Sequence, residues 1–203
     1  MGFIGNQPTP VPLTSSDITD GIVTTAKIAD NAVTDAKFST NALIDGLPTG
    51  SVLQTIQGTS DSRYTLDSTD TWENTGFVSL TFPNALQSGS KVLVRINVLI
   101  GETHDGNWTS RTAVTIFENS TNKGHATYGI VSSNAHDNGS TNTQYKSESM
   151  SGELLFTPSV TNGTYTLYCK APNSFERIIG GTHSNGANYP VGNTQVTLQE
   201  IKG

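Results

Sequence analysis

Cysteine is nearly absent from this chain of 203 residues, which holds one and therefore cannot close an intrachain disulfide. Cys169 lies in step with Tyr165 and Leu167 in an alternating stretch, which predicts a buried structural thiol. Charged residues make up only 14% of the chain and form no Lys/Arg cluster, so we expect no nucleic-acid groove. No apolar run approaches the length that spans a bilayer, so we expect no membrane insertion.

Signatures of catalysis and metal binding are also scarce. The sequence contains no G-x-S-x-G nucleophile elbow and no phosphate-binding loop. The spacing of the four histidines matches no metal-ligand motif, and fixed spacing is what makes such motifs specific. Glu153, Glu176 and Glu200 lie in or beside predicted strands and are expected to face solvent. We therefore expect no enzymatic activity, no cofactor and no metal.

What the sequence does contain is a repeat of ten residues, from position 18 to position 47. Turn pairs recur in it as Asp20-Gly21 and Asp30-Asn31, because Gly and Asn tolerate positive φ. Repetition at a fixed period is the signature of stacked structural units. The apolar positions of the repeat are Ile18, Val23, Ile28, Val33, Phe38 and Leu43.

Each repeat is too small to bury its own apolar side chains, so it cannot meet the entropy cost of ordering alone. It needs a partner surface, and copies of the same chain are the simplest one. We therefore predict that residues 15–50 form the shaft of a homo-oligomeric fibre, with the six apolar positions as its interface. The alternative is a polar linker whose repetition is fortuitous.

The residues before the repeat predict an extended arm, residues 1–14. Proline at alternate positions from Pro8 to Pro12 favours a polyproline-like conformation that cannot join the interior of a sheet. The arm also carries Phe3, Ile4 and Leu13, which we interpret as anchors that seat in another protein. A frayed tail is the alternative.

The remaining residues, 51–203, contain every Trp and Tyr and are long enough for a core. Short alternating segments separated by turn clusters predict an antiparallel sandwich of the jelly-roll type, with about eight strands. Gly152 is interpreted as a β-bulge in the last long strand before the Asn-Gly turn at Asn162. The main predicted strands are 77–82, 91–100, 110–118, 124–132, 144–157, 164–171 and 195–201.

Three predicted loops, 101–107, 134–143 and 183–193, are rich in Gly, Asn and His. Loops on a rigid sandwich often carry recognition, so these are candidate receptor-binding loops. Trp108 and Tyr189 could instead belong to the core or to an interface between copies. The candidate binding residues are His104, Trp108, His136, His183 and Tyr189.

Several segments carry a family likeness. The repeat, with Ile18-Thr-Asp-Gly-Ile-Val-Thr-Thr-Ala-Lys27, resembles the shaft repeats of tail-fibre and appendage proteins of tailed bacteriophages. The later part resembles the C-terminal heads of the same proteins, and the likeness covers nearly the whole chain. The segments that carry the head likeness are Gly50-Ser-Val-Leu-Gln54, residues 72–82, Ser90-Lys-Val-Leu-Val94 and residues 193–201.

The resemblance implies a homotrimer that is made in the host cytoplasm and resides in the virion. Its arm would dock on other tail or capsid proteins, and its jelly-roll heads would attach to a glycan or protein of the host surface. A capsid or tail decoration or adaptor protein with no receptor role is the alternative. A depolymerase spike is a further alternative, but the second part of the chain is too short for the β-helix that such a spike needs.

Overall fold

The chain divides into two units, residues 1–46 and residues 47–203, and the second is called the head below. In the first unit the structure describes a short helix, α1 (Ala42–Gly46), and a few single residues before it. The computed structural model describes residues 42–66, 70–104, 109–136, 144–171, 177–180 and 192–203, with Thr14, Ser16, Gly21, Val23, Thr24, Ala26 and Ile28.

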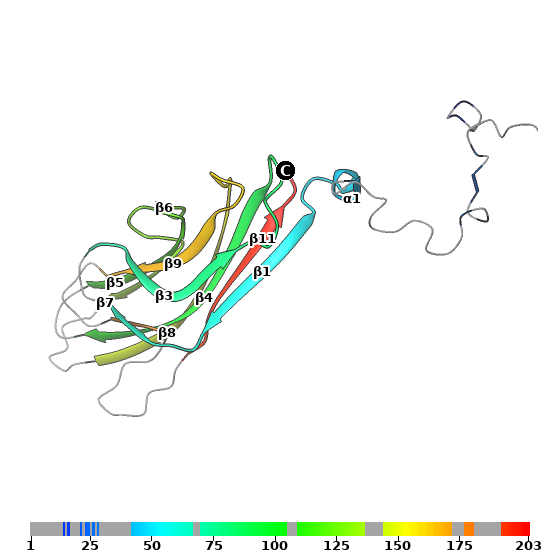
Figure 1. Ribbon diagram of the computed structural model, residues 1–203. Coiled ribbons are helices and arrows are strands. Elements are labelled where there is room, and N and C mark those ends of the chain that lie inside the picture. The colour runs from blue at the N-terminus through cyan, green and yellow to red at the C-terminus, as the bar shows by residue number, and fades with distance from the viewer. Residues whose placement is uncertain are drawn as a thin grey trace, which may run out of the picture. The chain divides into compact units, whose positions relative to one another are not determined.

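The head is built from two antiparallel sheets that face each other (Figure 1). Sheet A has the order β1 (Val52–Ser60), β11 (Thr194–Ile201), β4 (Lys91–His104) and β8 (Gln144–Phe156). Short strands β10 (Arg177–Ile179) and β2 (Tyr64–Leu66) continue it beside the second half of β4. Sheet B has the order β3 (Glu73–Thr81), β9 (Thr164–Lys170) and β5 (Thr109–Glu118), followed by β6 (Thr121–Asn122) and β7 (Val131–His136), which both pair with β5.

The strand order is that of a jelly roll. Sheet A runs β1-β11-β4-β8 and sheet B runs β3-β9-β5-β7, so the chain crosses repeatedly between the two layers. Two Greek keys wound in this way are the defining feature of the jelly-roll sandwich. The predicted all-β, antiparallel sandwich is therefore confirmed for the head, whereas the shaft and the trimer stay predictions.

Two predicted segments are wrong in detail. The turn expected at 101–107 begins too early, because β4 continues to His104 and its last residues pair with Gln144–Ser147 of β8. The strand expected at 124–132 is wrong, because β7 starts only at Val131. In both places, pairing with a neighbouring strand determines where the strand begins or ends. The local composition of the sequence does not show this pairing.

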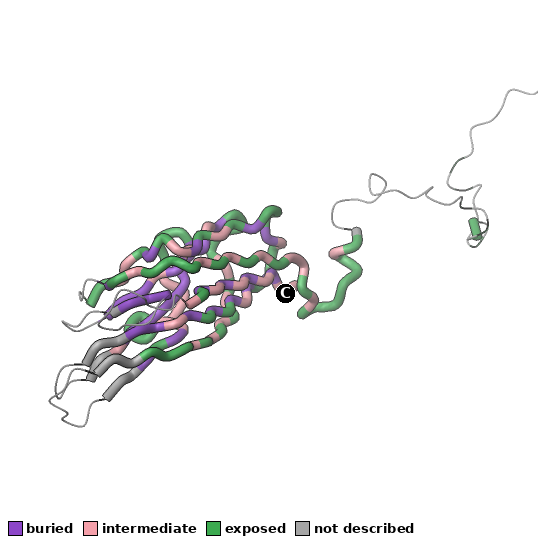
Figure 2. Tube along the Cα trace, turned by 90° about the horizontal axis from the view of Figure 1, so that it is seen from below, coloured by how far each residue is buried: buried purple, intermediate pink, exposed green. Residues whose placement is uncertain are grey.

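The core lies between the sheets and consists of the inward side of every long strand (Figure 2). Val92, Val94 and Ile96 of β4 have no exposed surface, while the alternate residues of the same strand face outward. Cys169 is free and buried, as predicted. Burial, with a smaller contribution from the charge of Glu73, raises the pKa of its thiol far above the ordinary range, so the thiol is unreactive at neutral pH.

Glycines allow the two sheets to close on each other at both edges. On one edge, a Cβ at Gly58 of β1 would lie 2.8 Å from a methyl of Val78 on β3. On the other edge, a Cβ at Gly152 of β8 would lie 2.6 Å from a methyl of Val131 on β7. The expected bulge at Gly152 is wrong, because the register between β4 and β8 is unbroken there. The glycine at position 152 instead allows the two sheets to approach each other closely at this edge.

Two buried carboxylates fix the loops at the end of the head where β1 begins. Glu118 accepts hydrogen bonds from the backbone N–H of Ser159 at 2.9 and 3.0 Å and pairs with Lys123 Nζ at 2.6 Å. Glu200 accepts from Gln54 Nε2 at 2.7 Å and from the backbone N–H of Gln87 at 2.6 Å. Glu200 is 1% exposed, so the expectation that it faces solvent is wrong.

Electrostatics explain why Glu118 stays ionised. Burial alone would raise the pKa of its carboxyl, but hydrogen bonds from Lys123 and Ser159 and the charge of Lys123 hold that pKa below its usual value. Tyr165 donates to Glu118 Oε1 at 3.2 Å. Burial and the negative charges of Glu118 and Glu200 raise the pKa of the phenol far above its ordinary range, so Tyr165 remains a donor.

We expect Gly152→Ala to lower the free energy of unfolding by about 1–3 kcal/mol, because the new methyl group overpacks the edge where β8 meets β7. Urea unfolding followed by tryptophan fluorescence measures the change. Gly46→Ala is the matched control, since a Cβ there meets nothing within 4 Å. Equal stability of the two variants would contradict the closure argument.

We expect Glu118→Gln to destabilise the head by about 3 kcal/mol at neutral pH, because Lys123 is left buried without its partner. The folded-state pKa of Glu118 is depressed, so its contribution is present above the usual glutamate pKa and is lost as pH falls through the folded value. Urea unfolding across the acid range should therefore show the gap between wild type and variant closing. A gap that is constant with pH would contradict an ionised Glu118.

Candidate functional site

The structure describes half of the predicted shaft positions. Val23, Ile28 and Leu43 are 55%, 44% and 68% exposed in the single chain. Isolated exposed apolar residues are ordinary on protein surfaces, but these occupy repeating positions of a decapeptide. Three shaft positions, Ile18, Val33 and Phe38, and the three anchor residues, Phe3, Ile4 and Leu13, lie outside the described residues.

The predicted receptor loops stay untested. Trp108, His183 and Tyr189 lie outside the described residues. His104 and His136 are the last residues of β4 and β7, which belong to different sheets, and their side chains are not described.

A different surface emerges on sheet B, where residues Lys123–Ile130 leave the sheet and return to it. We call this segment the β6–β7 excursion. The backbone N–H of Lys123 donates to Ile116 O at 3.0 Å, and that of Ile130 donates to Val114 O at 2.8 Å. Both ends are therefore fixed to β5, and the residues between them lie over sheet B.

The path of the excursion depends on two glycines that approach sheet B closely. Gly129 has φ 65° and its α-carbon faces the carbonyl oxygen of Val114, where no side chain fits. At Gly124 a Cβ would lie 2.5 Å from the hydroxyl oxygen of Thr115. Between them, His125 and Gly129 exchange backbone hydrogen bonds of 3.0 and 2.9 Å, so the tip is a closed turn.

Aromatic side chains support the excursion from beneath. Trp72 Nε1 donates to Ala126 O at 3.2 Å, and the Trp72 ring meets that of Phe117 edge-on with centroids 6.2 Å apart. Phe117 stacks in turn on Tyr168 at 4.0 Å. Lys170 Nζ lies 5.0 Å from the Trp72 ring centre. These contacts anchor the excursion, through Trp72, to side chains of β5 and β9.

At the tip, Tyr128 is exposed and yet fixed in orientation. The residue is 48% exposed, and its ring stacks on His125 at 4.8 Å between centroids and has the Arg111 guanidinium 4.6 Å from its centre. Both groups therefore contact the same ring. The Nδ1 atom of His125 accepts from the backbone N–H of Thr127 and of Tyr128, at 3.1 and 3.2 Å, which fixes the imidazole as well.

Sequence reasoning missed this site because it treated residues 124–132 as a strand. The two glycines that bracket His125 and Tyr128 were the available signal, since glycine inside a strand pattern marks close backbone approach. A rigid, half-exposed aromatic residue is the kind of side chain that contributes most to binding surfaces.

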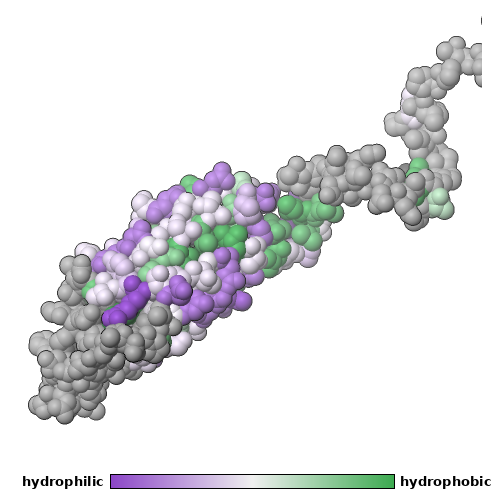
Figure 3. Space-filling view, turned by 60° about the horizontal axis from the view of Figure 1, so that its bottom comes forward, coloured by the Kyte–Doolittle hydropathy of each residue, from purple (hydrophilic) through white to green (hydrophobic). Residues whose placement is uncertain are grey.

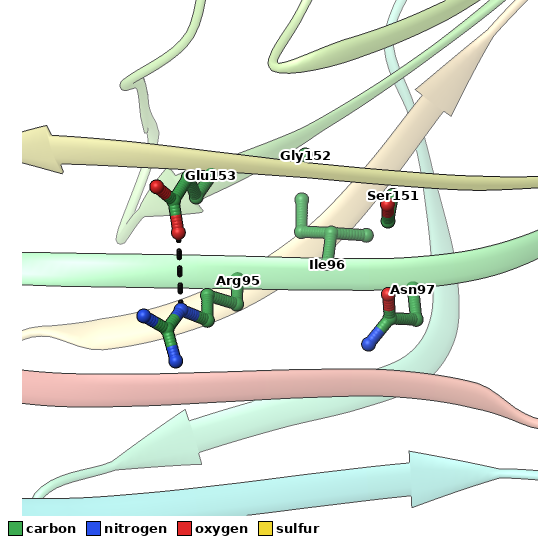
Figure 4. Close-up of a pocket in the computed structure, with 6 residues that line it drawn as sticks. All are labelled: Arg95, Ile96, Asn97, Ser151, Gly152 and Glu153. Carbon is green, nitrogen blue, oxygen red and sulfur yellow. Dashed lines mark hydrogen bonds and ion pairs between the residues drawn. The ribbon is translucent and has the colours of Figure 1, made fainter.

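A shallow depression of about 360 Å³ lies on sheet A, between β4 and β8 (Figure 4). Arg95 Nε and Glu153 Oε2 lie 3.1 Å apart across it, so its charges compensate each other and specify no ligand charge. Among the described residues, no group of three His, Cys, Asp or Glu side chains could hold a metal ion. No helix within the described ranges has the length and hydropathy of a bilayer-spanning segment.

No protein-family model matches this chain. No curated protein is significantly similar to it.

Proposed function

We propose that this chain is a homotrimeric fibre protein of a bacteriophage virion. The observation that carries the proposal is a decapeptide repeat whose described apolar positions are exposed in one chain and which leads directly into a jelly-roll head. The repeat cannot bury its apolar side chains within itself, and identical chains side by side would bury them at matching positions. The arm of residues 1–14 would attach the fibre to other tail or capsid proteins.

The head would attach the virion to the host surface without catalysis. The β6–β7 excursion supports this role, because it presents Tyr128 and His125 on a platform held by Trp72. Preorganised aromatic residues bind at low entropic cost, since their side chains are already ordered. The alternative is a decoration or adaptor protein, in which the same head would be structural only.

We expect the double variant Val23→Asp/Ile28→Asp to lose the trimer, because charge would then stand at positions that copies bury together. Sedimentation velocity at fixed protein concentration gives the oligomeric state. The matched control is Ser16→Asp/Thr24→Asp, which adds the same charge at exposed positions outside the apolar pattern. If the control dissociates as readily as the test variant, the apolar positions are not the interface.

We expect the head, residues 47–203, to bind at least one polysaccharide on a microarray of bacterial surface polysaccharides. Tyr128→Ser should weaken that binding about tenfold or more, the usual effect of losing an aromatic hot spot. Val160→Ser is the control, because Val160 is similarly exposed in the turn after β8. Binding that survives Tyr128→Ser would exclude the excursion as the site, and no binding anywhere on the microarray would favour the decoration role.

A further inference from the structure

The two outer faces of the sandwich are covered to different extents. Sheet B carries the β6–β7 excursion and Trp72 over its outer side. On sheet A, Gly192 lies against the side chain of Leu99, in the half of β4 that is farther from the start of β1. The near end of sheet A has no such cover among the described residues.

Apolar side chains gather at this near end. Leu47, Val52 and Leu155 are 41%, 48% and 49% exposed, and Leu93 and Ile201 beside them are half-buried. Register places four of them on neighbouring strands, since Val52 pairs with Ile201 in one row and Leu93 pairs with Leu155 in the next row of the same face. Leu47 precedes β1, and its carbonyl oxygen accepts a hydrogen bond from Lys202 Nζ, next to Ile201. Figure 3 shows apolar surface along this side of the head. We call these five residues the basal patch.

The basal patch spans the width of sheet A. It reaches from β1 across β11 and β4 to β8, which is three strand spacings or about 14 Å. Gln199 and Thr55 lie in the same row as Leu93 and Leu155, and Lys91 lies in the row of Val52 and Ile201, at the rim of the patch. An apolar surface of this extent on an otherwise polar head indicates contact with another molecule.

The charge of this face fits a second copy of the same chain. The chain carries a net charge of −6, so most pairs of identical surfaces would repel. On the outward side of sheet A, the described charged residues are Lys91, Arg95 and Glu153, and the last two already pair with each other. Depletion of uncompensated charge is typical of the core of an interface between subunits.

Position along the chain supports the same partner. Along the chain, the exposed apolar residues Leu43, Leu47 and Val52 follow one another from the end of the repeat into β1. Chains that associate through the repeat would bring several heads together, each entered through the strand that carries Val52. The partner nearest to each basal patch is then another copy.

We propose that the basal patch is the interface through which the heads of identical chains meet. This inference rests on the proposed function, because it requires the chains to associate. It places sheet A toward the other copies and leaves sheet B, with the β6–β7 excursion, facing outward. Each head would thus use one face for assembly and the other for recognition.

The test measures how fast a maleimide labels single cysteines introduced into the full chain. Cys169 is buried and gives little background. Leu155→Cys and Val52→Cys report on the basal patch, and Ser79→Cys and Thr81→Cys report on the exposed outer side of sheet B. Rates in denaturant correct for intrinsic reactivity, and light scattering on the same samples gives the oligomeric state.

We expect an oligomer in which the two basal-patch cysteines react about tenfold more slowly than the two controls, since residues at the core of an interface are desolvated. An oligomer in which all four cysteines react at the same rate would overturn this interface and leave the shaft intact. A monomer would overturn both the interface and the proposed fibre.

Discussion

The head depends on the closure of its two sheets at both edges. Inward side chains of β4, β5, β9 and β11 fill the space between the layers, but the layers can meet at their rims only where a side chain is missing. Gly58 supplies that space against β3 and Gly152 supplies it against β7. The side chains between the closed sheets are buried, and the two buried carboxylates at one end hold the connecting loops through charge-assisted hydrogen bonds.

Closure leaves the outer faces of the two sheets available for interaction with other molecules, and the chain treats these faces differently. Sheet B is overlaid by a turn whose path is fixed by Gly129, and that turn presents Tyr128 in contact with His125 and Arg111. Sheet A has few charged residues on its outer side and exposes apolar residues at the end where β1 begins. This difference between the two faces is expected of a fibre whose heads associate through sheet A and recognise a host through sheet B.

The sequence was sufficient to predict the sandwich, because alternation in 91–100, 110–118 and 195–201 is strong and each segment became a strand of the core. It was insufficient where pairing partners decide the structure. The polar residues after Ile100 stay in β4 because β8 runs beside them, and Glu200 is inside because Gln54 and Gln87 satisfy it. The excursion was missed because the strand-like pattern around Val131 extends toward the N-terminus, into the residues of the excursion. The ten-residue period of the apolar positions in the repeat was visible in the sequence. A single chain does not show which surface covers those positions.

In the fibre that we propose, identical chains cover the apolar positions that a single chain leaves exposed. The most direct test is the mass of the unmodified full chain in solution by light scattering, with residues 47–203 measured beside it. Association into a trimer predicts three times the chain mass of 21.5 kDa for the full chain. A full chain that remains at 21.5 kDa over the accessible concentration range would contradict the account, and the repeat would then require a different partner.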